Sequence, residues 1–125
     1  MKRTLFMLMV IFILGIAAAD AWAQNLTGTW SCNDGGTYYL HQRGNELWWL
    51  GESRDKGATW TNVFQGQIAG TQIKGNWADV PQGRIMGSGQ MVLQIIKTAP
   101  FSPEVRLKAI TKTGGFGGSE WKKVK

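Results

Sequence analysis

Hydrophobic and polar residues alternate along most of the chain after residue 24, and glycine-rich turns interrupt the alternation at short intervals. No stretch there keeps the apolar period of a helix for several turns, whereas a period of two is typical of a strand with one face in a core. The pattern predicts eight strands, over residues 26–31, 37–42, 46–53, 59–68, 71–77, 88–96, 104–112 and 119–124.

Short turn-forming segments join these strands, which predicts consecutive antiparallel hairpins in a single domain over residues 24–125. Eight strands in a chain of this length favour an all-β fold, an up-and-down β-barrel, because closure removes exposed strand edges. A two-sheet β-sandwich is the alternative. Glycines within strands, such as Gly51 and Gly75, fit bends at barrel corners.

The alternation also predicts which side chains face the core. In the third strand Leu47, Trp49, Gly51 and Ser53 share one face, which leaves Trp48 on the other. Since an exposed large apolar side chain usually marks a contact, Trp48 is the candidate partner surface. In later strands the residues expected to share the core-facing side are Ile73, Gly75 and Trp77 in the fifth, Met91, Leu93 and Ile95 in the sixth, and Val105, Leu107 and Ala109 in the seventh.

Residues 1–23 have the organisation of a secretory signal peptide. Lys2 and Arg3 provide a basic start, residues 5–19 are apolar, and Ala21-Trp22-Ala23 has the small-x-small pattern that predicts cleavage after Ala23. The apolar run is shorter than the roughly 20 residues of a membrane span, so no integral membrane anchor is expected. The mature protein is therefore predicted to be secreted or periplasmic.

The net charge and the predicted export limit the classes of partner that this protein could bind. The net charge is +6, and the basic residues concentrate in residues 84–125, but export argues against nucleic acid as the partner. A small-molecule ligand or an extracytoplasmic protein is expected instead, and a homo-oligomer through Trp48 is left open.

The single cysteine, Cys32, excludes an intramolecular disulfide, and burial is the commonest fate of a free thiol.

Few residues here suit catalysis. The single histidine, His41, lies on an aromatic strand, and a nucleophile triad needs an orienting histidine. The glycine-rich residues 114–118 precede a strand, so they do not form a phosphate cradle. Paired carboxylates for glycoside hydrolysis could come from Asp34, Glu46, Glu52, Asp55 or Asp79. Most of these lie in or beside turns, where aspartate serves turn geometry. We therefore expect a protein that is not an enzyme and that carries no metal or cofactor.

Leu26-Thr27-Gly28-Thr29-Trp30 resembles the opening of the calycin barrels, which comprise lipocalins, fatty-acid-binding proteins and avidins. In those families the tryptophan of Gly-x-Trp packs across the closed end of the barrel, beneath a basic residue of the last strand. The resemblance implies a structural plug of Trp30 with Lys122 or Lys123.

The avidin branch is the closer match, because Asn33, Gly36 and Thr37 follow the opening motif. An extra residue separates Trp30 from Asn33 relative to the avidin spacing. The resemblance implies that Asn33 and Thr37 bind ligand, with Ser53 as a third position.

The tryptophans suggest a binding site. Trp49, Trp60 and Trp77 either line a pocket or fill the barrel, and a pocket would draw its polar groups from Asn33, Thr37, Tyr39, Ser53 and Asn62. The leading hypothesis is an exported barrel that binds a small apolar or amphipathic molecule. One alternative is an inhibitor or interaction module that binds a partner protein through Trp48 and residues 98–103. Another is carbohydrate binding by Trp48 with Trp60.

Overall fold

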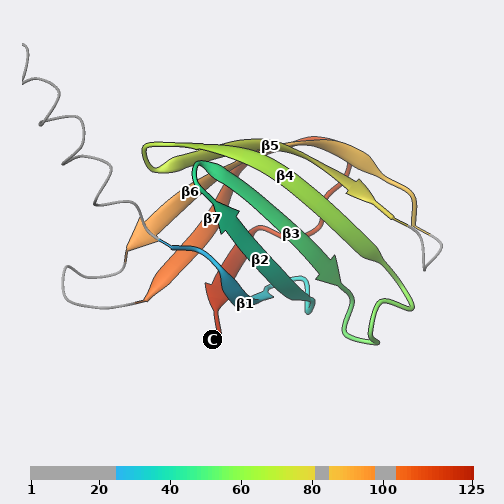
Figure 1. Cartoon of the computed structure of the whole chain (residues 1–125). Coiled ribbons are helices and arrows are strands. Elements are labelled where there is room, and N and C mark those ends of the chain that lie inside the picture. Colours follow the sequence, from blue (N-terminus) through green and yellow to red (C-terminus); the bar gives the residue numbers. More distant parts are fainter. Residues whose placement is uncertain (1–24, 81–84, 98–103) are drawn as a thin grey trace, which may run out of the picture.

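The computed structural model describes residues 25–80, 85–97 and 104–125. The predicted leader with its cleavage site and the predicted loop over residues 98–103 lie outside these ranges. Eight antiparallel strands form one closed barrel in which each pairs with its sequence neighbours and the last pairs with the first (Figure 1). They are β1 (Gly28–Cys32), β2 (Thr37–Arg43), β3 (Glu46–Glu52), β4 (Thr61–Ala69), β5 (Gln72–Asp79), β6 (Ser88–Lys97), β7 (Val105–Lys112) and β8 (Glu120–Lys123).

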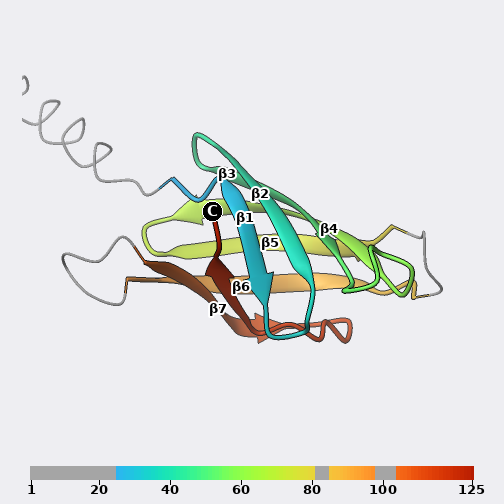
Figure 2. The same cartoon turned by 90° about the horizontal axis from the view of Figure 1, so that it is seen from below.

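The predicted up-and-down barrel is confirmed and the sandwich alternative is excluded. Every predicted strand is present, with its ends no more than about two residues from the observed ones. Because consecutive strands are antiparallel, successive connections alternate between the two ends of the barrel. Figure 2 shows the β3–β4 and β7–β8 connections toward one end and the β4–β5 turn at the other. Among the described residues, no helix is long and apolar enough to cross a membrane.

Barrel closure depends on a close approach at Gly28. The amide of Thr29 donates to the carbonyl oxygen of Lys125 at 2.7 Å, next to the β1–β8 pair. Gly28 has φ of 151°, and a Cβ there would lie 2.5 Å from that same oxygen. A side chain at this position would push the C-terminal segment away from β1, so the glycine of Gly-x-Trp is required by packing.

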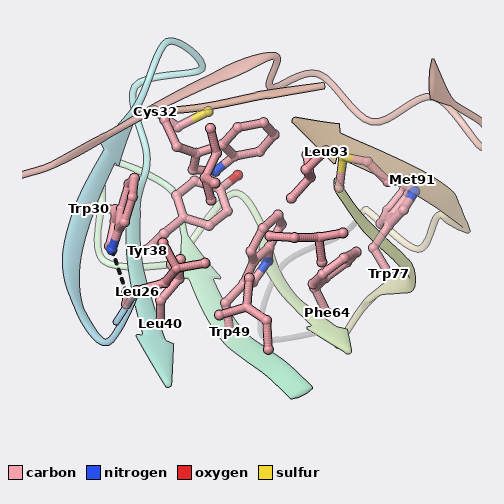
Figure 3. Close-up of a cluster of buried hydrophobic side chains, with 14 of the residues drawn as sticks. Leu26, Trp30, Cys32, Tyr38, Leu40, Trp49, Phe64, Trp77, Met91 and Leu93 are labelled. Atoms are coloured by element: carbon pink, nitrogen blue, oxygen red, sulfur yellow. Dashed lines mark hydrogen bonds between the residues drawn. The ribbon is translucent and has the colours of Figure 1, made fainter. Parts of the chain in front are cut away.

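The barrel interior is filled by aromatic and aliphatic side chains that converge from the surrounding strands (Figure 3). The Trp49 ring stacks on Phe64 with centroids 4.4 Å apart, and it meets Trp121 at 5.2 Å and Tyr38 at 5.3 Å. Each such pair contributes about 0.5–1.5 kcal/mol beyond the burial of area. Most of the core-facing residues predicted for β3, β5, β6 and β7 are buried, while Gly75, Ile95 and Ala109 are only partly buried.

Strand β2 has the opposite phase to the one that the avidin resemblance implied. Tyr38 and Leu40 are buried, whereas Thr37 and Tyr39 face outward, with Tyr39 45% exposed. Tyr38 lies directly across from Gly51, and a Cβ on that glycine would be 2.4 Å from the Tyr38 ring. The missing side chain at Gly51 therefore makes the room that turns Tyr38 inward. The expectation that Thr37 and Tyr39 line the interior is wrong.

Trp30 is completely buried, and its indole N–H donates to the backbone oxygen of Leu26 at 2.9 Å (Figure 3). Lys123 is its direct partner across the β1–β8 pair, so both side chains point toward the interior of the barrel. Lys122 pairs with Ser31 on the outer phase and is exposed. Of the two lysines proposed as part of the plug, only Lys123 is placed for it.

Candidate functional site

A cleft of about 230 Å³ opens at the end of the barrel where the β1–β2, β3–β4, β5–β6 and β7–β8 connections meet. Its walls are three aromatic rings and its polar groups are one amide and two carboxylates. These residues are Trp60, Trp77, Phe116, Asn62, Asp34 and Asp79. Asn62 and Asp79 face each other in the β4–β5 pair, and the closed barrel brings Asp34 and Phe116 to the same mouth from the β1–β2 and β7–β8 connections.

Trp60 stands at the end of the β3–β4 connection and is held by close packing. A Cβ on Gly36 would lie 2.4 Å from the outer edge of the Trp60 indole, so the ring rests on the β1–β2 turn. The ring also packs on Tyr38, with centroids 5.9 Å apart. Trp60 therefore joins two neighbouring connections and forms one fixed wall of the cleft.

Trp77 and Phe116 form a second aromatic wall. The Trp77 indole N–H donates to the backbone oxygen of Thr113 at 3.0 Å, which ties β5 to the β7–β8 connection. Phe116 meets Trp77 edge-on at 4.9 Å and is itself buried. Gly114 and Gly115 have φ of 82° and 84°, a conformation that favours glycine, so they set the path that carries Phe116 into the mouth.

Two hydrogen bonds connect side chains of the aromatic core to polar residues of the mouth. The Trp49 indole N–H donates to the amide oxygen of buried Asn62 at 2.9 Å, and the Tyr38 hydroxyl donates to the Asp34 carboxylate at 2.5 Å. Burial, followed by this hydrogen bond, raises the pKa of Tyr38 above its ordinary value, while nearby Asn62 acts in the opposite direction. Tyr38 therefore remains a neutral donor that orients Asp34.

Asp79 lies at the end of β5 on the same inward phase as Trp77. One of its carboxylate oxygens accepts the backbone N–H of Gly87 at 2.7 Å, from the segment that leads into β6. Its direct partner across the β4–β5 pair is Asn62. The two carboxylates come from the ends of β1 and β5, which are half the circumference of the barrel apart.

The structure brings some of the predicted ligand-binding residues to this mouth. Trp60 and Trp77 line the cleft, whereas Trp49 lies below it in the aromatic core. Ser53 borders an adjoining shallower depression, where its hydroxyl donates to Asp55 and accepts the backbone N–H of Trp60 at 3.2 Å. Ser53 thus fixes the β3–β4 connection that carries Trp60.

The remaining predicted residues lie elsewhere. The Asn33 amide nitrogen donates to the Ser119 hydroxyl at 2.7 Å and its oxygen accepts the Ser119 N–H at 2.9 Å, so it pins the first turn to the start of β8. Thr37 and Tyr39 are on the outer face, as described above. Trp48 is also on the outer face and 48% exposed, as its phase predicted, and so it does not form a platform with Trp60.

Sequence reasoning named Asp34 and Asp79 only among carboxylates that could pair for hydrolysis, and it missed Phe116 as a member of a site. Asp34 and Asp79 lie beside predicted turns and were interpreted as turn residues. A signal was present at Asp79, which is two residues after inward-facing Trp77 and therefore shares its phase. Phe116 gave a weaker signal, as a lone large apolar residue among four glycines.

No protein-family model matches this sequence, and no curated protein or solved structure shows significant similarity to it. The resemblance to calycins and avidins therefore stays a prediction that rests on its own residues. The functional argument depends on the geometry of the cleft.

Proposed function

We propose that this protein is an exported, non-catalytic binding protein that holds a small amphipathic molecule in the mouth cleft. The observation that carries the proposal is the convergence of Trp60, Trp77 and Phe116 around a small number of polar groups. Binding sites for small molecules have this composition of aromatic walls with a few placed polar groups. The basic start, apolar run and Ala21-Trp22-Ala23 pattern support export.

The size of the cleft limits the ligand. About 230 Å³ is below the range of roughly 300–1,000 Å³ that drug-sized ligands occupy. The packed interior beneath the cleft, with Trp49 stacked on Phe64, leaves the ligand at the mouth. The expected ligand is therefore a single compact molecule with one apolar face, partly exposed at the end of the barrel.

The residues of the cleft favour binding over catalysis. Among its described lining residues there is no histidine, cysteine, serine or lysine, and its two carboxylates, Asp34 and Asp79, come from opposite sides of the barrel and are held by backbone N–H and hydroxyl donors. His41 lies on the outer phase of β2, directly across from Trp48. We therefore assign no reaction to the protein.

Native mass spectrometry of the protein exported from cells tests the proposal. We expect a stoichiometric extra mass that leaves on denaturation, and we expect Trp60→Ala to lose it. Trp48→Ala is the matched control, because it removes the same side chain from the outer face. The proposal would be contradicted by two results together: the wild-type protein carries no extra mass, and its tryptophan fluorescence does not change when a library of compact amphipathic molecules is added.

A second candidate function, binding of a partner protein, is favoured by the outer face of β2, β3 and β4. Tyr39, Leu50 and Val63 are direct cross-strand neighbours, each 38–46% exposed, and Trp48 lies on the same face. Four adjoining exposed apolar side chains form the type of patch that marks contact sites. We expect the double variant Trp48→Ala/Leu50→Ser to abolish association with the partner protein, measured by sedimentation. Unchanged association would exclude this face.

A further inference from the structure

We propose that the ligand carries a cationic group, such as an ammonium, that is held between Asp34 and Asp79 over the aromatic walls of the cleft. This inference rests on the proposed binding function, because it assigns the chemistry of the molecule that the same cleft takes. Three observations carry it: the placement of the carboxylates, their neutral partners, and the rings between them.

The two carboxylates face the mouth from opposite walls. Asp34 follows β1 and Asp79 ends β5, and the order of strands around the closed barrel places these two strands half a circumference apart. Both residues line the same cleft. A small cation between them is attracted by both, whereas an anion at that position is repelled from both sides.

Each carboxylate is positioned by neutral donors. Asp34 accepts the Gly36 N–H at 2.8 Å and the Tyr38 hydroxyl at 2.5 Å, and Asp79 accepts the Gly87 N–H at 2.7 Å through one oxygen. Such bonds fix the carboxylate groups but bring no compensating positive charge. A neutral ligand that covered the cleft would take water from both carboxylates without replacing it, which costs free energy.

The described cations near the mouth form no ion pair with these carboxylates, although Arg54 borders the adjoining depression together with Asp34. The Arg54 guanidinium lies over Gly35, with a nitrogen 3.1 Å from where a Cβ would stand, and Lys112 donates to the backbone oxygen of Gly118 at 3.0 Å. Within the described residues, neither Asp34 nor Asp79 forms an ion pair. The described lining of the cleft thus holds two carboxylates and no basic side chain, in a protein whose net charge is positive.

The aromatic walls complete a site for an alkylammonium group. Trp60, Trp77 and Phe116 border the space between the carboxylates. The negative face of an aromatic ring attracts a cation, and tryptophan does so most strongly. Rings and carboxylates together match a cation with an apolar surface better than they match a hydrated metal ion.

Two pairs of probes of nearly equal shape test the charge requirement. Choline is compared with its neutral counterpart 3,3-dimethylbutan-1-ol, and 2-phenylethylamine is compared with 2-phenylethanol. Binding is followed by tryptophan fluorescence and calorimetry at pH 7. We expect each cation to bind about tenfold or more tightly than its neutral counterpart, a ratio that cation–π and carboxylate contacts supply together.

Asp79→Asn keeps an oxygen that can accept the Gly87 N–H while it removes the charge. We expect this variant to lose the preference for the cations and to bind the neutral probes as before. Glu120→Gln is the matched control, because it makes the same change of net charge at an exposed position of β8 outside the cleft. Asp34→Asn provides an independent second variant on the opposite wall.

The outcomes separate the two proposals. If cations bind no better than their neutral counterparts, or if Asp79→Asn keeps the preference in full, the cationic ligand is overturned. Neutral probes that still bind, and that Trp60→Ala no longer binds, would leave the binding function intact. If none of the four probes binds, the cationic ligand is overturned, whereas the binding function is decided separately by native mass spectrometry of the exported protein.

Discussion

Trp49 donates its indole N–H to the amide oxygen of Asn62 at 2.9 Å, and this bond joins the aromatic core of the barrel to the floor of the cleft. Asn62 is only 3% exposed, so water cannot replace it as the acceptor. The same residue lies directly across from Asp79 in the β4–β5 pair. The stability of the core and the shape of the mouth therefore depend on one amide.

Asn62→Ala should destabilise the fold by about 1–3 kcal/mol, because it leaves the buried Trp49 N–H without an acceptor. Urea unfolding monitored by tryptophan fluorescence measures the change. Asn76→Ala is the control, since Asn76 is exposed on β5 and should cost less than about 0.5 kcal/mol. Equal effects of the two substitutions would show that the Trp49–Asn62 bond contributes nothing.

Trp49→Phe should cost more stability than Trp121→Phe, although both residues are buried in the same aromatic cluster. Within the described chain, the Trp121 indole nitrogen is buried without a hydrogen-bond partner. Replacing it removes an unsatisfied donor, whereas Trp49→Phe leaves the buried Asn62 oxygen unpaired. We expect a difference of about 1–2 kcal/mol in the free energy of unfolding, measured in urea. The reverse order would contradict this assignment.

Stability should fall in acid through Asp55. Hydrogen bonds from Ser53 and then Thr59 lower the pKa of Asp55 from 3.8 to about 2. The folded state therefore favours the ionised carboxylate, so the stabilisation is present above about pH 4 and is lost as the pH falls toward 2. The difference in melting temperature between the wild type and Asp55→Asn should shrink over this interval. A difference in melting temperature that stays constant with pH would exclude the role of Asp55. Thr59→Val removes one of the hydrogen bonds to Asp55, so this variant should show a smaller difference in melting temperature from Asp55→Asn at pH 6.

Cys32 should react slowly in the folded protein. The thiol is buried, as predicted, and burial raises its pKa from 9.0 to about 12. The thiolate is the reactive form, so the reactive fraction at pH 8 falls by roughly a thousandfold relative to a thiol with pKa 9.0. Alkylation by iodoacetamide should be very slow in buffer and fast in urea. Equal rates would mean that the thiol is accessible in the native barrel.

Strand β2 illustrates where pattern alone was insufficient. Tyrosine stands on both of its phases, at 38 and 39, so the aromatic residues did not distinguish the faces. The contrast between Leu40 and His41 carried the correct signal, but the resemblance to avidins favoured the opposite phase. The space left by Gly51 on the neighbouring strand then decided that Tyr38 points inward.

The sequence by itself determined the strands, their order and the inner faces of most of them. These follow from local alternation and turn residues, because one face of each strand packs in the core and the other faces water. Barrel closure decided the rest, since only the pairing of β1 with β8 brings Asp34, Trp60, Asp79 and Phe116 to one mouth. No local pattern encodes that convergence, because four connections at one end of the barrel must be placed before a cleft exists between them.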